Sequence, residues 1–531
     1  MPNQFSSRQQ ISKPAVTSKG GIVAAQSRRA AEIGAEVLAA GGDCVDAVVA
    51  TGFALGVLEP WMSGMGGGGA MVLYRAKENK VEVIDYGMRA PDSLRLADYP
   101  LVGDGSLAPD LFPWARVKAD RNLHGPGAIA VPGVVAGMGE AHQRYARLPW
   151  QDLLAPSVKL AAEGLLIDWW TTLSITSSVA DLRRYPASAA AFLKDGLPPS
   201  APWGIKSSVR MPQDELKATL THLASAGARD FYHGDLARSI ARDIQAAGGC
   251  LAVEDLAAFK AHLREPLKIP YRGGTVYATP ELTAGPTLAH TLRLLQASLQ
   301  PSGSVPGTDA YIAYAEALQA AYRERLNGMG DADGRRSLGA DYLAPACTTH
   351  YAVVDRDGNM AAVTQTLLSN FGSKFQTPQS GIMMNNGIMW FDPTPGTTNS
   401  LAPGKRCLCN YTPAVAEAAD GRRLALGASG GRRILPSVAQ ILSFVMDFGM
   451  DLDAAIHQPR IDASEGAIVI ADTRLPPEAR AALGARFDYE EAHLQTLPLK
   501  FACPSVVLRD GATNSGASEI ASPWSEAVAE G

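Results

Sequence analysis

The stretch 345–367 contains residues whose types and spacing could support nucleophilic chemistry. It reads PACTTHYAVVDRDGNMAAVTQTL, so Cys347 and Thr348 stand directly before an alternating strand pattern. A threonine hydroxyl is a weak nucleophile unless a base accepts its proton. At a chain N-terminus the residue's own α-amine, with a pKa of about 7.7–8.0, can be that base. Thr348 gains such an amine only if the Cys347–Thr348 bond is cleaved; otherwise ordinary strand preference explains the threonine.

A second candidate nucleophile is Ser429. The stretch 424–435 reads LALGASGGRRIL and contains the pattern G-x-S-x-G in a strand–turn–helix context, which suits a serine hydrolase. Asp451 or Asp472, followed by His493, would complete a triad in chain order. Glycines at this place can instead present backbone N–H groups at a helix N-terminus as an oxyanion hole, or simply form a tight turn.

Two further motifs offer little chemistry. The sequence SGMGGGG at 63–69 lacks the GK[ST] ending of a phosphate-binding loop, so a packing role is favoured. Cys407 and Cys409 are one residue apart with no second cysteine pair nearby, which makes a weak metal site. We therefore predict neither a metal nor a cofactor.

Composition limits the classes of partner. The 531 residues carry a formal net charge of −5, with 46% hydrophobic and 19% charged residues, as in folded globular proteins. We predict no nucleic-acid or membrane partner, because the charge is mild and no run of about 18 apolar residues occurs. The N-terminal residues contain no apolar stretch typical of a secretory signal. The six cysteines are scattered, which favours reduced thiols and a cytoplasmic location.

Helical and strand-like segments alternate along the chain. Apolar spacing predicts a helix over 21–42, and Asp43 is typical of the N-cap of a second helix. The region 150–330 is mainly helical, and short strands fill the C-terminal third. Other predicted elements are a strand over 70–76, a loop over 331–345 and a helix over 433–448.

Alternating patterns on both sides of the sequence RDGN predict a β-hairpin that begins at Thr348, because Asp-Gly is a strong short hairpin signal. If the hairpin is centred between Asp357 and Gly358, the numbers of paired residues sum to about 715, with a register that could slip by one or two residues. Thr348 then faces Leu367, and residues 366–368 lie within its reach.

Several stretches together resemble the γ-glutamyltranspeptidase family of N-terminal-nucleophile hydrolases. The resemblance covers nearly the whole chain, and its most specific parts are the N-terminal signature and the nucleophile hairpin. The similar stretches are residues 30–74, from AAEIGAEVL to GGGGAMVLY, VPGVVAGM at 131–138, residues 247–273, the hairpin TTHYAVVDRDGNMAAVTQTL, SGIMMNNGIMWFDP at 380–393 and GASGGRRI at 427–434.

The resemblance implies an α+β fold, a four-layer αββα sandwich. It also implies that one precursor cleaves itself into a large subunit, residues 1–347, and a small subunit, residues 348–531. The two subunits are then each other's partners, with a dimer of heterodimers as one option for their assembly.

The same resemblance assigns roles to particular residues. Thr348 matches the nucleophile, released by cleavage after Cys347, and Thr366 matches the second threonine, which hydrogen-bonds the nucleophile's α-amine. Gly430 and Gly431 match the oxyanion-hole pair. Ser429 is then a structural residue rather than a nucleophile.

The chain departs from the family pattern where a γ-glutamyl substrate's α-amine and α-carboxylate are held. Without those contacts a substrate ammonium would be poorly paired, which argues against a typical γ-glutamyl pocket. The segment between 392 and 405 is also shorter than the family's lid-bearing form, and an open site favours hydrolysis over transfer. The departures are Leu368 for an asparagine, Gly387 for a glutamine or glutamate, Trp390 for an acidic residue, Cys409–Asn410 for a serine pair, and Gly87 for an arginine, with Arg89 two residues away.

The resemblance therefore implies a self-processing amide hydrolase or acyltransferase acting on a small-molecule amide. The default substrate is a γ-glutamyl amide such as glutathione. The alternative is a small carboxylated amide such as oxamate, because an oxamate amidohydrolase belongs to this family, and Arg89 or Arg432 would then hold the carboxylate. Asn410 and Trp390 complete the predicted substrate site. A Ser429 hydrolase and a non-catalytic homologue are the remaining alternatives.

Overall fold

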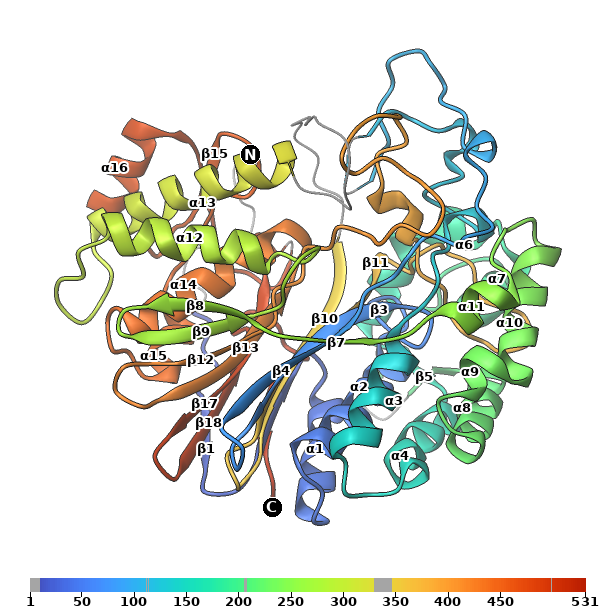
Figure 1. The fold of residues 1–531 in the computed structure, drawn as a ribbon, viewed down its shortest axis with the longest axis horizontal. Helices are drawn as coiled ribbons and strands as arrows, with labels where there is room; N and C mark the ends of the chain where they lie inside the picture. Colours follow the sequence, from blue (N-terminus) through green and yellow to red (C-terminus); the bar gives the residue numbers. More distant parts are fainter. Residues whose placement is uncertain (1–9, 111, 113, 205–207, 329–345, 498) are drawn as a thin grey trace.

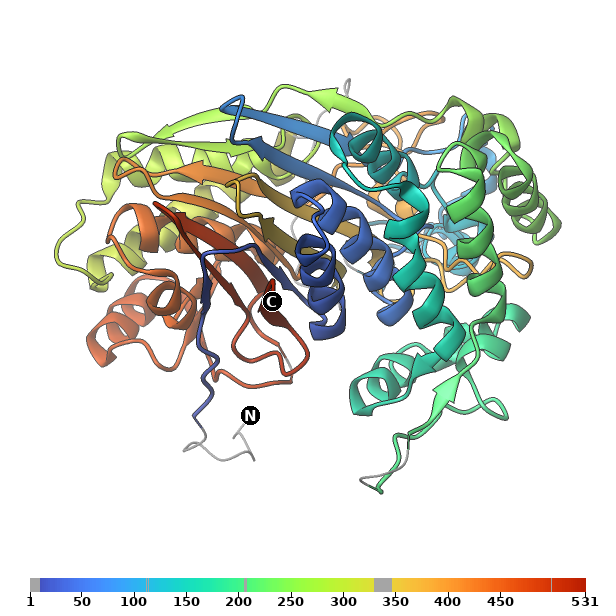
Figure 2. The ribbon, with the colours of Figure 1, turned by 90° about the horizontal axis from the view of Figure 1, so that it is seen from below.

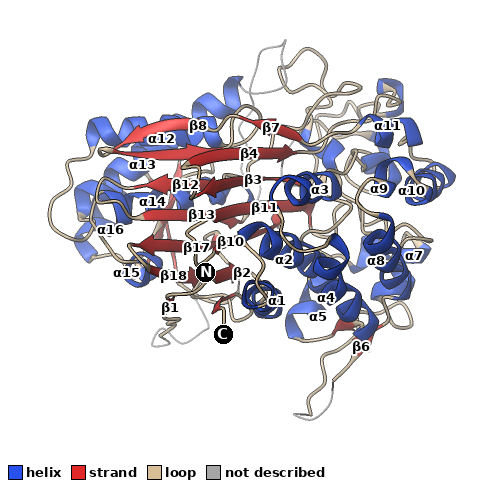
Figure 3. Ribbon diagram, turned by 60° about the horizontal axis from the view of Figure 1, so that its bottom comes forward, coloured by secondary structure: helices blue, strands red, loops and turns tan. Residues whose placement is uncertain are grey.

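The computed structural model describes residues 10–110, 112, 114–204, 208–328, 346–497 and 499–531. In this part of the chain, two β-sheets lie face to face and helices cover the outer face of each (Figures 1 and 3). This is the α+β, four-layer αββα arrangement that the resemblance predicts. The predicted loop over 331–345 lies outside the described residues.

The first sheet contains the candidate nucleophile hairpin at its centre. As described, it has seven strands, all paired antiparallel. In spatial order they are β19 (Glu526–Ala529), β2 (Ile22–Ala25), β10 (Ala346–Val354), β11 (Met360–Ser369), β3 (Gly68–Arg75), β4 (Lys80–Tyr86) and β7 (His262–Arg264).

The second sheet packs on the first through a layer of small apolar side chains. Gly427 allows a close approach between the sheets, because a Cβ atom there would lie 2.4 Å from the imidazole ring of His350 on β10. Within the described ranges its seven strands, in spatial order, are β1 (Val16–Ser18), β18 (Thr513–Ser518), β17 (Cys503–Asp510), β13 (Arg423–Ser429), β12 (Ala414–Glu417), β9 (Gly274–Ala278) and β8 (Leu267–Tyr271).

One helical layer and its extension cover the first sheet (Figure 2). The helices whose apolar faces pack there are α1 (Arg28–Ala39), α2 (Cys44–Leu58), α3 (Val134–Tyr145), α4 (Trp150–Glu163), α8 (Asp214–Ala226), α9 (Asp230–His233), α10 (Asp235–Ala246) and α11 (Val253–Ala258). A smaller apolar cluster joins residues of α5 (Trp169–Thr176), α6 (Val179–Leu182), α7 (Pro186–Phe192) and the strand pair β5 (Leu165–Leu166) and β6 (Arg210–Met211).

The other helical layer covers the second sheet and lies on the opposite side of the molecule in Figure 3. It consists of α12 (Gly285–Ser298), α13 (Thr308–Gly328), α14 (Ile434–Met446), α15 (Leu452–His457) and α16 (Pro477–Arg486), with a small sheet of β14 (Ile461–Asp462), β15 (Ile468–Asp472) and β16 (Asp488–Ala492). Short 3₁₀ helices are η1 (Leu96–Asp98), η2 (Lys118–Asp120), η3 (Pro126–Ala128), η4 (Gly387–Trp390) and η5 (Gly431–Arg433).

The local sequence signals have mixed outcomes. The Asp43 side chain accepts hydrogen bonds from two backbone N–H groups of the first turn of α2, which confirms the predicted N-cap. The predicted helix over 433–448 is α14. The predicted helix over 21–42 is wrong at its start, because Ile22–Ala25 forms strand β2. That strand is fully buried between β10 and β19, so its apolar run has no alternation to distinguish it from a helix.

Both sheets combine strands from the two sides of the Cys347–Thr348 bond. In the first sheet, β2 from the N-terminal part pairs with β10 and β19 from the C-terminal part. In the second sheet, β1 pairs with β18 and β9 pairs with β12. The two parts therefore form one interleaved structure rather than two separate domains.

Two findings concern partners and metals. No helix in the described part has the length and apolar character needed to cross a membrane. Among the described residues, no group of three or more His, Cys, Asp or Glu side chains is arranged to hold a metal ion. The thiols of Cys407 and Cys409 contact backbone carbonyl oxygens, those of Gly387 and Cys407 respectively.

Candidate active site

The predicted hairpin is present and brings Thr366 to Thr348. Strand β10 pairs with β11, and residues Asp355 to Asn359 form the connection. Cys347 pairs with Leu368, whereas Thr349 pairs with Gln365. Thr348 therefore stands opposite two residues of β11, Thr366 and Leu367, and the β-bulge has its extra residue on β11. A bulge re-aims the side chain at its extra residue. The structure thus confirms that residues 366–368 lie within reach of Thr348.

Two hydroxyl groups meet at the carbonyl oxygen of Cys347. Thr348 Oγ1 lies 2.8 Å from this oxygen and 3.2 Å from Thr366 Oγ1. The Thr366 hydroxyl donates to the same carbonyl oxygen at 2.5 Å and accepts from the backbone N–H of Leu368 at 2.9 Å. Thr348 and Thr366 are both buried. The hydroxyl of one threonine therefore lies beside a peptide carbonyl that the other threonine polarises.

Leu368 has an unusual backbone conformation next to this pair. Its φ of 85° lies in the left-handed region, which non-glycine residues rarely adopt. This conformation directs its N–H to Thr366 Oγ1. Strained residues of this kind gather at functional sites, so the backbone here holds the Thr366 hydroxyl in place.

The thiol of Cys347 is a poor competitor for the nucleophile's role. Burial raises its pKa to about 12, although the nearby Lys374 ammonium acts in the opposite direction. The thiol donates a hydrogen bond to Asn370 Oδ1 at 3.2 Å. It is therefore neutral and engaged near neutral pH, whereas thiolate is the reactive form.

His350, two residues after Thr348, belongs to the packing between the sheets. Its Nδ1 contacts Thr364 Oγ1 at 2.8 Å. Burial lowers the pKa of this imidazole to about 3. The ring is therefore neutral at physiological pH, and its hydrogen bond is to Thr364 rather than to Thr348.

Gly430 and Gly431 form the junction between β13 and α14, through η5. Their φ angles of 135° and 61° are both positive, and η5 packs against β10. A Cβ atom at Gly430 would lie 3.0 Å from Ala502 Cα, so the site requires glycine for space as well as for conformation. Because the junction precedes a helix N-terminus, it is suited to stabilising negative charge. Their oxyanion-hole role remains a prediction.

The described contacts do not assemble a triad around Ser429. Its hydroxyl accepts a hydrogen bond from the Gln26 side chain. His493 contacts Thr473. The two candidate acids are also occupied: Asp472 pairs with Arg474, and Asp451 caps helix α15. The geometry thus supports a structural role for this serine.

Three of the four predicted substrate-binding residues lie in two contact groups, one of which contains Arg432, the chain neighbour of Gly431. The Arg432 guanidinium lies over the Phe112 ring, 5.1 Å from its centroid, and Trp390 meets the same ring edge-on at 5.1 Å. Asn410 Oδ1 accepts from the Arg325 guanidinium at 3.0 Å. Burial lowers the pKa of Arg432 from its usual value. Arg432 follows Gly431 directly, which places this cation beside the predicted oxyanion hole.

Arg89 is placed differently. Its guanidinium forms an ion pair with Asp92, and its backbone pairs with Val131 and Arg406. It lines a cavity of about 120 Å³. That cavity shares no lining residue with the larger one at Gly430. Of the two arginines predicted to hold a carboxylate, Arg432 lies closer along the chain to the predicted oxyanion hole, although neither arginine lines the larger cavity.

Two residues near the site carry no signal in the sequence. Arg325, near the end of α13, is buried, which lowers its pKa to about 10, and it donates to the Cys409 carbonyl oxygen at 2.6 Å. Asp110 accepts hydrogen bonds from the Ser369 hydroxyl at 2.9 and 3.0 Å. The sequence pattern predicts that an arginine in a polar helix and an aspartate in a loop lie on the surface. Only the tertiary contacts show that these two residues are buried near the site.

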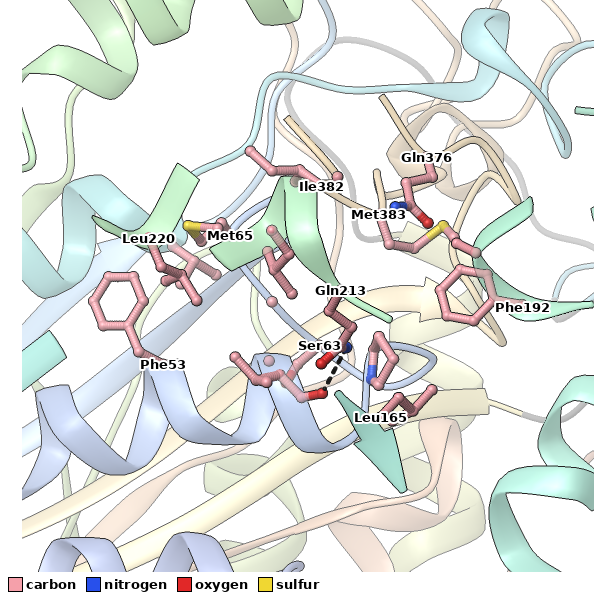
Figure 4. A pocket seen from close by; sticks show the side chains of 18 of the residues that line it. Phe53, Ser63, Met65, Leu165, Phe192, Gln213, Leu220, Gln376, Ile382 and Met383 are labelled. Carbon is pink, nitrogen blue, oxygen red and sulfur yellow. Dashed lines mark hydrogen bonds between the residues drawn. The ribbon is translucent and has the colours of Figure 1, made fainter. Parts of the chain in front are cut away.

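Two cavities near the hairpin differ greatly in size. The larger, about 450 Å³, is lined by Cys347, Ser429 and Gly430, with aromatic and aliphatic walls. The smaller, about 40 Å³, is lined by Ser63 and Met65 of the glycine-rich stretch, and in it Gln213 donates to a backbone carbonyl (Figure 4). The smaller space suits water molecules, so the larger is the candidate substrate site.

The sequence profile of the Gamma-glutamyltranspeptidase family matches residues 30–346 and 341–528. The chain belongs to the γ-glutamyltranspeptidase family. Over 502 residues it is 33% identical to the Acylase ACY 1 proenzyme of Pseudomonas sp. (strain V22), covering 89% of this chain and 88% of that protein. Over 489 residues it is 31% identical to the Glutathione hydrolase proenzyme of Escherichia coli (strain K12), covering 84% and 81%. The chain is thus an enzyme of a family with hydrolytic members.

A solved structure supports the same fold. Cephalosporin acylase from Bacillus halodurans matches with a TM-score of 0.84 at 24% identity, covering 100% of this chain and 99% of that chain. At this identity the comparison establishes the architecture, and function must be argued from the site.

This γ-glutamyltranspeptidase family member has buried apolar groups where the family pattern predicts contacts to a substrate ammonium. Leu368, Trp390 and Cys409 are 1%, 4% and 1% exposed. At Gly387, a Cβ atom would lie 2.5 Å from Ala130 Cβ, so no longer side chain fits without movement. These positions therefore provide no carboxylate or amide for an ammonium group.

Proposed function

We propose that this chain is a self-processing amide hydrolase whose nucleophile is Thr348. The observation that carries the proposal is the contact of both threonine hydroxyls, Thr348 at 2.8 Å and Thr366 at 2.5 Å, with the carbonyl oxygen of Cys347. This arrangement places a nucleophile and a hydrogen-bond donor on the same peptide group, as an acyl transfer requires.

Processing begins when Thr348 Oγ1 attacks the carbonyl carbon of Cys347. The new C–O bond forms and the Cys347–Thr348 C–N bond breaks, while the hydroxyl proton passes to the departing nitrogen. The Thr366 hydroxyl stabilises the charge that develops on the carbonyl oxygen. Water then hydrolyses the ester, giving a carboxylate on Cys347 and a free α-amine on Thr348.

Turnover uses the amine that processing creates. The Thr348 α-amine accepts the proton of Oγ1, which then attacks the substrate amide carbon. Backbone N–H groups of Gly430 and Gly431 stabilise the oxyanion. The C–N bond breaks, the amine leaves with the proton, and an acyl ester on Thr348 remains. Water hydrolyses this ester to the acid and restores the hydroxyl.

The interleaved sheets support a cleaved product that remains one enzyme. Strand β2 pairs through its four residues with residues 351–354 of β10, which lie on the other side of the cleaved bond. Backbone pairing of this kind and the shared core between the sheets would hold residues 1–347 and 348–531 together after cleavage.

The apolar positions around Leu368 and Trp390 support an amide substrate without an α-amine. A buried ammonium without partners is unfavourable, so a γ-glutamyl amide such as glutathione would bind poorly. Oxamate and simple acyl amides lack the ammonium. The relative of 33% identity is named an acylase proenzyme, a name that fits an acyl amide as the substrate.

Intact-mass measurement of purified protein tests the nucleophile. Wild type should give two fragments that meet between Cys347 and Thr348, and Thr348→Ala should stay full length without amidase activity. Thr349→Val is the matched control, because Thr349 is buried beside the nucleophile and its Oγ1 has no hydrogen-bond partner among the described residues; it should process normally. An active wild type of a single full-length mass would overturn the proposal and favour Ser429. A single mass without activity would favour the non-catalytic alternative.

A further inference from the structure

The larger cavity has mostly apolar walls. Its volume of about 450 Å³ lies within the range of small-molecule sites, which is roughly 300–1,000 Å³. Trp61 and Met62 form one wall, Leu173 and Trp170 of α5 another, and Leu499 and Phe501 a third.

An aromatic cluster lies at the wall that Trp170 forms. The indole rings of Trp170 and Trp524 both line the cavity and stack with centroids 4.2 Å apart and planes 12° apart. Trp169 meets Trp524 edge-on at 5.4 Å and is 48% exposed. Aromatic surface that reaches solvent beside a cavity can receive an apolar group from water.

Most polar groups that line the cavity already have protein partners. The amide nitrogen of Asn370 donates to Ser174, Ser177 and Ser178 at 2.9–3.0 Å. Arg433 donates to the Leu499 carbonyl at 2.6 Å, and Lys500 pairs with Glu490 at 3.2 Å. Three polar atoms of lining residues have no hydrogen-bond partner among the described residues: Gln26 Oε1, Trp61 Nε1 and Trp170 Nε1. None of the three is charged, and two belong to indole rings, so the cavity is better suited to an apolar group than to a charged one.

The position of the cavity assigns it to one half of the substrate. Cys347 lines it, and in processing the acyl group that moves onto Thr348 Oγ1 is that of Cys347. In turnover the substrate's acyl carbon forms the same bond to Oγ1. The substituent of that carbon is therefore expected on the side that Cys347 occupies.

We propose that this cavity binds the acyl half of the substrate and that this half is a large apolar group, an alkyl chain or an aromatic ring. The inference rests on the proposed Thr348 amidase. It names a substrate class that differs from both γ-glutamyl amides and oxamate. The reaction is R–CO–NH–R′ plus water giving R–COO⁻ and the protonated amine, with R in the cavity.

A series of primary amides tests the acyl half, because each releases only ammonia. Self-processed wild type is assayed with acetamide, butanamide, hexanamide and phenylacetamide, beside oxamate and γ-glutamyl amides. We expect kcat/KM to rise by about fourfold for each methylene group that enters the cavity. A matching series lengthens the amine half instead, from N-methylacetamide to N-hexylacetamide, and should show no such rise.

Two leucines provide a matched pair of variants. Leu173 lines the cavity and Leu166 does not, and both are 42% exposed, so neither glutamine substitution disturbs the core. Leu173→Gln should lower the ratio of kcat/KM for hexanamide to that for acetamide by at least about fourfold, the effect of one lost methylene contact. Leu166→Gln should keep the wild-type ratio.

The outcomes separate the inference from the function on which it rests. A processed enzyme with a flat acyl series, or with oxamate or a γ-glutamyl amide as its best substrate, overturns the apolar acyl site and leaves the Thr348 amidase standing. A rise confined to the amine series overturns the assignment to the acyl half. An unprocessed chain that cleaves no amide removes the proposed function and the inference with it.

Discussion

The hydroxyl oxygens of Thr348 and Thr366 lie 3.2 Å apart across the hairpin, although the residues are 18 positions apart in the chain. Both hydroxyls contact the carbonyl oxygen of Cys347. A hydroxyl that attacks this carbonyl needs a partner that stabilises the developing oxyanion, and Thr366 is the donor already in place. In the proposed mechanism, one threonine of the pair would be the nucleophile and the other would stabilise the oxyanion.

Removing the Thr366 hydroxyl should slow processing far more than it affects folding. Thr366→Val keeps the side chain's shape but removes a donor to the Cys347 carbonyl, and loss of one oxyanion donor reduces rates by about 10²–10³-fold. Time courses of fragment appearance by intact mass measure the effect. Thr366→Ser, which restores the hydroxyl, should recover most of the rate. Processing of Thr366→Val at the wild-type rate would contradict the assigned role.

The thiol of Cys347 should be dispensable for cleavage. Its pKa of about 12 and its hydrogen bond to Asn370 keep it protonated, and only its carbonyl takes part in the proposed chemistry. Cys347→Ala should therefore yield the same two fragments at close to the wild-type rate. Retention of the full-length chain in this variant, with an unchanged melting temperature, would show that the thiol participates.

Short-range signals predicted the central part of the site. The Asp357–Gly358 turn and the alternation on both sides of it determine the hairpin, and the hairpin alone brings Thr366 to Thr348. The bulge opposite Thr348, in which β11 contributes the extra residue, shifts the pairing by one residue. It was not predictable, because nothing in the local sequence marks the extra residue. The contact between Thr348 and Thr366 was still predicted, because the expected register placed all three residues 366–368 within reach of Thr348.

Contacts between distant segments account for what the sequence did not reveal. Phe112 lies against both Arg432 and Trp390, and Arg325 reaches Asn410 from helix α13. The segments involved are separated by 80 to 320 positions or so, a distance at which side-chain periodicity carries no information. The wrong helix over 21–25 has a related cause, since a strand buried on both faces shows no alternation.

Gly430 should be intolerant of substitution for two separable reasons. Its φ of 135° suits only glycine, and an added Cβ would meet Ala502 Cα at 3.0 Å. Gly430→Ala should lower the melting temperature and also reduce kcat. Gly421→Ala is the control, because its φ of 88° is also positive but nothing lies within 4 Å of the added atom; it should affect stability alone. Alanine keeps the backbone N–H, so kcat should fall only because the added Cβ shifts the backbone; normal kcat in Gly430→Ala would contradict this prediction.

Turnover should increase with pH as the Thr348 α-amine loses its proton. A free α-amine has a pKa of about 7.7–8.0, and only its neutral form accepts the hydroxyl proton. The profile of kcat/KM against pH for a neutral amide should therefore show an acid limb near this value. His350 cannot produce it, since burial lowers its pKa to about 3. Glu59, with a pKa of about 8, is the other group that could produce this acid limb. If the α-amine is the base, the Glu59→Gln variant should keep the acid limb. Loss of the limb in that variant would assign the titration to Glu59.

Glu59 should make the stability of the precursor fall as the pH rises. Burial, with the nearby Asp168 carboxylate as a second cause, raises the pKa of Glu59 from 4.5 to about 8, and its Oε2 has no hydrogen-bond partner among the described residues. Between these two values the folded chain binds more protons than the unfolded chain, so the free energy of unfolding decreases by up to about 1.4 kcal/mol per pH unit. Glu59→Gln removes this dependence. The test compares Thr348→Ala, which stays uncleaved, with the double variant Thr348→Ala/Glu59→Gln in denaturant titrations. The free energy of unfolding of the double variant, relative to that of Thr348→Ala, should increase from pH 5 to pH 8. A difference that stays constant over this range would show that Glu59 is not protonated in the folded protein.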